Sequence, residues 1–87
     1  MSADLRADVQ SEVQAEMDRA VEIHGDLPRS ADRCCVILTE EVGEAAQAVT
    51  EWVHERGHIN DLRAELIQVI ATAQRWINNI DEGVMIP

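Results

Sequence analysis

The sequence contains no phenylalanine and no tyrosine, and its only aromatic residues are Trp52 and Trp76. A core without these rings has to be built from Leu, Ile, Val, Ala and Met, which are residues that pack helices. The 87 residues, 1–87, are expected to form a single small domain, in which one core is marginal. We therefore expect a homo-oligomer that shares its core between copies of the chain.

Long apolar runs are also missing. None approaches the ~20 residues that a membrane-spanning helix requires, so we expect no membrane partner. The first residues carry Asp4, Arg6 and Asp8, where a signal peptide would be apolar. These features predict a cytoplasmic protein.

Lysine is absent as well. All seven basic residues are arginines, and the net charge is −10. Polymeric nucleic acid is therefore not an expected partner, because phosphate binding needs a basic face. An acidic surface favours solubility, and it can also gather carboxylates that bind cations. An anionic substrate would need a metal ion to mediate its contact with such a protein.

Apolar residues recur at three- and four-residue spacing through most of the chain, and no period-two strand pattern is present. The pattern predicts helices over about 2–24, 30–56 and 61–79. The fold class is therefore all-α, a three-helix chain with antiparallel helices. We expect a core like that of a four-helix bundle, completed by oligomerisation.

Residues with known capping preferences mark the expected helix ends. Gly25 is placed to cap the first helix, and Ser30 to begin the second. Gly57 is expected to end the second helix, and Asn60 or Asp61 to cap the third. Residues 81–87 are interpreted as a frayed tail.

Glutamates on the second and third helices do not all belong to the expected wet surface. At about 100° per residue, Glu41 falls in the apolar arc of its helix, with Glu44 at the margin. A charge there is costly unless it is paired or bound to a metal ion. Glu65 lies at the edge of the apolar face of the third helix, next to Gln68. Oxygen ligands at i and i+3 on facing helices suit Mg²⁺, with Mn²⁺ as a second possibility.

The segment Glu40-Glu41-Val42-Gly43-Glu44, followed by Glu65-Leu66-Ile67-Gln68, resembles a known pattern. It is similar to the EExxE…ExxD signature of the MazG-like, all-α nucleoside triphosphate pyrophosphohydrolases. The likeness extends from about His24 to Ile80.

This resemblance implies a Mg²⁺-dependent enzyme that cleaves a (deoxy)nucleoside triphosphate to the monophosphate and pyrophosphate. It implies that Glu41, Glu44, Glu65 and Gln68 are the metal ligands. Glu40 and Glu41 are then the catalytic candidates, with Glu40 orienting a ligand or the attacking water. The resemblance also implies a homodimer or homotetramer.

One position departs from the family pattern. The fourth ligand is usually an aspartate, whereas this chain has Gln68, whose amide oxygen can bind a hard cation but adds no negative charge. The alternative is therefore a non-catalytic MazG-like helical module for oligomerisation or interaction.

Other side chains are candidates for substrate binding. Thr72, Arg75 and Asn79 share the Glu65 side of the third helix, and His24 ends the first. Arg75 could instead form a surface ion pair, and His24 could simply favour its helix C-terminus.

Two further patterns have competing explanations. The two tryptophans could stack on a base, although core packing is the favoured explanation. His54 to His58 matches the HExxH zinc-protease motif, but Gly57 is expected to interrupt the helix that this motif needs.

Overall fold

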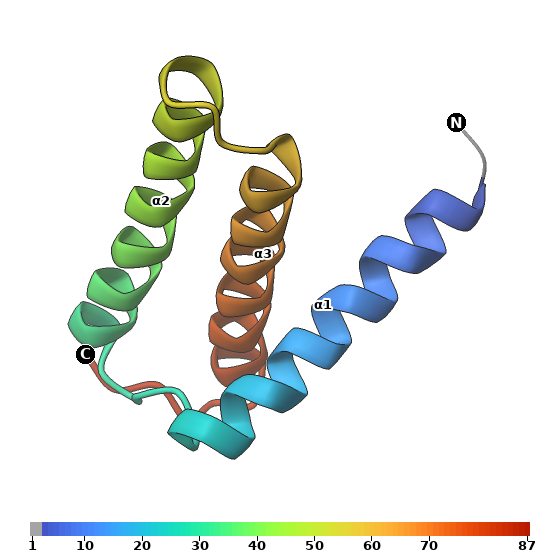
Figure 1. Ribbon diagram of the computed structural model, residues 1–87. Helices are drawn as coiled ribbons and strands as arrows, with labels where there is room; N and C mark the ends of the chain where they lie inside the picture. The colour runs from blue at the N-terminus through green and yellow to red at the C-terminus, as the bar shows by residue number, and fades with distance from the viewer. Residues whose placement is uncertain (1–2) are drawn as a thin grey trace.

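The structure is a computed structural model that describes residues 3–87, with side chains from Asp8 onward. It consists of three helices, α1 (Ala3–His24), α2 (Ala31–His54) and α3 (Ile59–Asp81) (Figure 1). No strand occurs in this part of the chain, so the all-α prediction is confirmed. α2 runs antiparallel to both α1 and α3, whereas α1 and α3 run in the same general direction (Figure 1). The predicted helix start at Ser2 lies outside the described residues.

α3 is the central helix, because it packs against both α1 and α2. α1 and α2 diverge from their shared connection and do not contact each other within the described residues (Figure 1). The contact between α1 and α3 contains a small core of Val13, Ile67 and Ala71, with Val9 and Met17 packed against it. Small buried residues lie on α2, where Ala45 and Ala48 leave room for close packing. α3 therefore holds the other two helices together.

The connection between α1 and α2 has the predicted caps. Gly25 takes a left-handed conformation (φ 75°), and its N–H donates to the carbonyl of Val21 at 2.9 Å. Ser30 is the N-cap of α2, and its hydroxyl accepts from the backbone N–H of Arg33 at 3.4 Å.

The end of α2 differs from the prediction. The helix ends at His54, two residues early, and the left-handed residue is Arg56 (φ 62°). Gly57 is required for a different reason, since a Cβ there would lie 2.9 Å from the carbonyl carbon of Glu51. Its N–H donates to the carbonyl oxygen of Glu51 at 2.7 Å. Gly57 thus allows a close backbone approach just after the helix.

The beginning of α3 also differs from the prediction. His58 is the N-cap, and its Nδ1 accepts from the backbone N–H of Asn60 at 2.9 Å. The helix therefore begins at Ile59, and neither Asn60 nor Asp61 caps it. His54 and His58 are separated by a helix end, so they do not form the single-helix zinc-protease motif.

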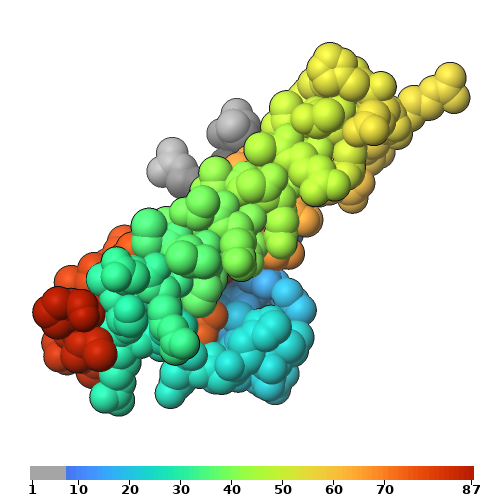
Figure 2. Space-filling model, turned by 90° about the vertical axis from the view of Figure 1, so that its left-hand side faces the viewer, coloured from blue at the N-terminus to red at the C-terminus, as the bar shows by residue number. Residues whose placement is uncertain are grey.

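The C-terminal residues are held against the start of α2, so the predicted frayed tail is wrong. Ile86 donates its N–H to the carbonyl of Arg29 at 2.8 Å and accepts from the N–H of Ala31 at 3.3 Å. Figure 2 shows the last residues beside the first turn of α2. The backbone carbonyl of Arg29 and the N–H of Ala31 have no partner within a helix, and the C-terminal residues supply their hydrogen bonds.

Much apolar surface stays exposed. Trp52 is 44 % exposed, so it is not a core residue of the single chain, whereas Trp76 is partly buried. In the described part of the chain, no helix combines the length and apolar character needed to cross a bilayer.

Candidate metal centre and adjoining cleft

Three glutamates meet between α2 and α3. Glu41 and Glu44 come from α2 and Glu65 from α3, and one carboxylate oxygen of each lies within 4.8 Å of the others. Glu41 and Glu65 are partly buried, whereas Glu44 is exposed. One turn of α2 separates Glu41 from Glu44, which places both on the side that faces α3. The fold therefore brings together three of the four residues that the motif suggested as ligands.

Two of these carboxylates each have a buried oxygen that lacks a hydrogen-bond partner, namely Oε2 of Glu41 and Oε2 of Glu65. Burial raises the pKa of Glu41, and the negative charges of Glu44, Glu65 and Glu16 raise it further. Burial likewise raises the pKa of Glu65, followed by the effects of Glu44, Asp61 and Glu16. The charged forms are therefore costly here, and a bound cation would remove that cost.

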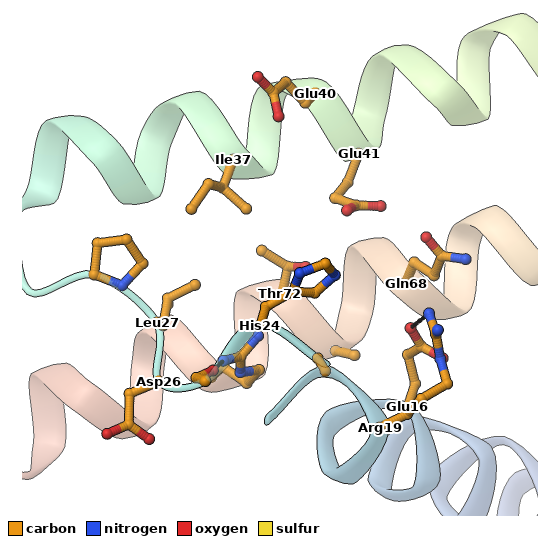
Figure 3. A pocket seen from close by; sticks show the side chains of 15 residues that line it. Glu16, Arg19, His24, Asp26, Leu27, Ile37, Glu40, Glu41, Gln68 and Thr72 are labelled. Carbon is orange, nitrogen blue, oxygen red and sulfur yellow. Dashed lines mark hydrogen bonds and ion pairs between the residues drawn. The ribbon is translucent and has the colours of Figure 1, made fainter. Parts of the chain in front are cut away.

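The donor set fits a hard divalent cation. Three carboxylates offer oxygen ligands only, which Mg²⁺ and Mn²⁺ prefer. Gln68 lies one turn after Glu65 on α3 and faces Glu41 across the gap between the helices (Figure 3). Its amide oxygen is a fourth donor of the same hard type.

A cleft of about 460 Å³ adjoins this centre and lies between α1 and α2 over α3. Its volume falls in the range of ~300–1,000 Å³ that small-molecule sites occupy. α1, α2, α3 and the connection after α1 each contribute to its lining. These residues include Glu16, Arg19, His24, Asp26, Leu27, Ile37, Glu40, Glu41, Gln68, Thr72 and Arg75 (Figure 3).

The candidates for substrate binding have different positions. Thr72 is buried in the lining of the cleft, and His24 is exposed at its edge. Arg75 also lines the cleft, where its Nη2 donates to the carbonyl of Gly25 at 2.9 Å. Arg75 therefore ties the α1–α2 connection to α3, and it forms no ion pair with the side chains described from Asp8 onward. Asn79 lies outside this cleft and lines a neighbouring depression.

Glu40, the catalytic candidate next to Glu41, is exposed and is not one of the three clustered carboxylates. Its side chain lies beside α2, whereas that of Glu41 points towards α3 (Figure 3). Glu40 still belongs to the lining of the cleft, so it can reach a group bound there.

Two residues of α1 that line the cleft, Glu16 and Arg19, were not predicted from the sequence. They pair with each other, with Arg19 Nη2 at 2.7 Å from Glu16 Oε1. Glu16 follows Val13 by three residues and precedes Ala20 by four, so it lies on the apolar side of its helix. This position could have indicated that Glu16 faces the other helices. No sequence pattern indicated that this part of α1 would lie near the glutamates of the other helices.

Comparisons with protein-family models, with curated proteins and with solved structures find no match for this chain. The resemblance to the MazG-like proteins therefore depends on the residues of the two motifs.

Proposed function

We propose that this chain is a Mg²⁺-dependent hydrolase that cleaves a (deoxy)nucleoside triphosphate between its α and β phosphates. The reaction consumes one water molecule, whose hydroxyl forms a new bond to either the α or the β phosphorus. The bond from that phosphorus to the bridging oxygen breaks, the bridging oxygen stays on the other phosphorus, and one proton is released. The products are a nucleoside monophosphate and pyrophosphate. The observation that carries the proposal is the pair of buried, unpartnered carboxylate oxygens on Glu41 and Glu65, beside a cleft of ligand size.

In this proposal, Glu41, Glu44, Glu65 and Gln68 would hold Mg²⁺, or Mn²⁺ in its place. When bound, the cation supplies charge neutralisation for the triphosphate and lowers the pKa of a coordinated water. The chain carries a net charge of −10, so it would repel a triphosphate that arrived without a cation.

The remaining roles belong to side chains of the cleft. Arg75 has five N–H donors, so it can hold Gly25 and still donate to a phosphate oxygen. Arg19 reaches the same cleft from α1, on the side opposite α2. Thr72 offers a hydroxyl from α3. Glu40, exposed at the edge, is positioned to accept a proton from the attacking water or to orient it.

The proposal includes a homodimer or homotetramer, which the small core of the single chain supports. It also includes a cytoplasmic location. Cys34 and Cys35 are both free thiols, which suits a reducing compartment.

The test is a product assay on purified protein with a panel of ribo- and deoxynucleoside triphosphates and Mg²⁺ or Mn²⁺. Pyrophosphate and monophosphate are expected in equal amounts, and both should be lost with EDTA or with Glu41→Gln. Glu22→Gln is the matched control, because Glu22 is exposed on α1 and outside the cleft lining, and it should keep full activity.

A second candidate function is a metal-binding interaction module without catalysis. The amide at Gln68 favours it, because the centre has one negative charge fewer than the family pattern supplies. A folded, Mn²⁺-loaded protein that releases no product from any nucleotide would support this candidate and refute hydrolysis.

A further inference from the structure

Glu16 is a carboxylate of α1 that has no role in the proposed hydrolysis. Its side chain is only 19 % exposed, whereas that of its partner Arg19 is 52 % exposed. Both residues line the cleft together with Glu41 and Gln68 (Figure 3). Glutamates on the solvent side of a helix are usually far more exposed, so the position of Glu16 in the cleft calls for an explanation.

Glu16 lies close enough to the metal centre for its charge to act there. Burial is the main cause of the raised pKa of Glu41 and of Glu65, and the negative charge of Glu16 contributes to both. Interactions between charges in water fade within about 8–10 Å at moderate ionic strength. Glu16 therefore shares the electrostatic environment of two proposed ligands, although it belongs to a different helix.

The proposed ligand set has three negative charges and one neutral amide, that of Gln68. The carboxylate of Glu16 is not among the oxygens that cluster within 4.8 Å of one another, so Glu16 is not a member of that set. Mg²⁺ usually keeps several of its waters when it binds a protein. A carboxylate just outside the ligands can therefore stabilise the cation through its charge and through hydrogen bonds.

Arg19 holds Glu16 in the cation-free chain. Its Nε donates to Glu16 Oε2 at 3.0 Å, and its Nη2 donates to Glu16 Oε1 at 2.7 Å. The hydrogen bonds and charge of Glu16, and more weakly the charge of Glu41, raise the pKa of Arg19. Arg19 thus offsets part of the negative charge beside the centre. An exposed ion pair of this spacing contributes little to stability, so a divalent cation can compete with Arg19 for Glu16.

We propose that Glu16 is an outer carboxylate of the metal centre, which adds from α1 a fourth negative charge beside the neutral Gln68. Arg19 competes with the cation for this carboxylate. The inference rests on the metal binding of the proposed function, but it does not depend on hydrolysis. It makes α1 a part of the metal site, although the four proposed ligands lie on α2 and α3.

The test measures Mn²⁺ affinity by calorimetry at about 0.15 M ionic strength, where distant exposed charges are screened. The variants are Glu16→Gln and Arg19→Gln, and circular dichroism monitors their folding. Glu12→Gln controls for the loss of an arginine pair on α1, because Glu12 Oε1 accepts from Arg63 Nη1 at 2.8 Å outside the cleft lining. Glu40→Gln controls for the loss of a charge within that lining, since Glu40 is exposed and outside the cluster.

Glu16→Gln should weaken Mn²⁺ binding by about 10- to 100-fold, which is the range for loss of a partner outside the ligand set. Arg19→Gln should tighten binding, because Glu16 then has no competing partner. Glu12→Gln and Glu40→Gln should stay within about threefold of the parent, since exposed charges and exposed ion pairs contribute little.

The opposite directions of the two effects separate an action on the cation from a structural role. If the pair only shaped the cleft, its loss would weaken binding in Glu16→Gln and in Arg19→Gln alike, and that result would overturn the inference. Parent affinity in Glu16→Gln, or an equal weakening in Glu40→Gln, would overturn it as well. If Glu16→Gln fails to fold, Arg19→Gln decides, because an affinity that does not rise contradicts the competition.

The same titrations separate this inference from the proposed hydrolysis. A parent chain that binds Mn²⁺ with the expected effect of Glu16, but hydrolyses no nucleotide, refutes hydrolysis alone. A parent chain that hydrolyses nucleotides while Glu16→Gln binds Mn²⁺ as tightly as the parent refutes this inference alone. A parent chain that binds no Mn²⁺ refutes both the metal centre and the role of Glu16.

Discussion

Glu41→Gln should make the metal-free protein more stable while it removes metal binding. The carboxylate oxygens of Glu41, Glu44 and Glu65 lie within 4.8 Å of one another. At that separation, two unit charges repel by about 1 kcal/mol in water and about 3 kcal/mol near a protein surface. Glu44 is exposed and Glu41 and Glu65 are only partly buried, so the smaller figure applies to both pairs that Glu41 forms, and removal of the two repulsions should add ~1–2 kcal/mol to the free energy of unfolding.

Thermal unfolding in EDTA and in Mn²⁺, at one fixed protein concentration, measures this effect. In EDTA, Glu41→Gln should raise Tm by roughly 5–10 °C, since 1 kcal/mol corresponds to about 4–8 °C in a domain of this size. Mn²⁺ at 100 times its Kd should stabilise the unsubstituted chain by about 2.7 kcal/mol and leave the variant unchanged.

Glu40→Gln is the matched control for this experiment. Glu40 is the adjacent residue, carries the same charge and is exposed outside the cluster, so its replacement should change stability by less than ~0.5 kcal/mol. The Mn²⁺-induced shift should remain in that variant. A Glu41→Gln variant that is less stable than the parent in EDTA, or that keeps the Mn²⁺ shift, would refute the argument from repulsion.

Three further results are expected. Because the pKa values of Glu41 and Glu65 are raised in the folded state, that state binds more protons than the unfolded state. The stability of the metal-free protein should therefore be highest below about pH 4.3, the usual pKa of a glutamate, and it should fall as the pH rises through the raised pKa values. Unfolding in EDTA from pH 4 to 8 measures this fall, and a rise with pH would contradict it. Gln68→Asp should tighten Mn²⁺ binding by about tenfold in calorimetry, because it adds a fourth negative ligand, and unchanged affinity would mean that this side chain does not bind the ion. Gly43→Ala should stabilise α2 by ~0.5–1 kcal/mol, whereas Gly25→Ala should destabilise the chain because Gly25 has a positive φ, and denaturant unfolding compares the two.

Periodicity predicted most of the fold because each helix has a regular apolar side. It also placed Glu41 towards α3, since the direction of a side chain round a helix follows from residue number alone. The end of α2 and the beginning of α3, on either side of Gly57, were less predictable. A glycine signal does not distinguish a left-handed residue from a close backbone approach, and His58 is an uncommon N-cap.

Contacts between helices were the least predictable part. The apolar stripe of α1 shows that the helix packs somewhere, but not that Val13 lies against Ile67 and Ala71 of α3. For this reason the sequence did not indicate Glu16 as a neighbour of Glu41. Core packing was the favoured explanation for Trp52, yet this side chain stays 44 % exposed.

The divergence of α1 from α2 has a consequence for how this protein can change over generations. All three clustered carboxylates lie on α2 and α3, whereas one wall of the cleft belongs to α1, which touches α3 alone. Substitutions at Arg19 or His24 can therefore reshape that wall while leaving the carboxylate cluster intact. Selection could act on what the cleft accepts, independently of the residues that would hold the cation, so ligand preference should diverge faster among descendants of this sequence than the carboxylates do.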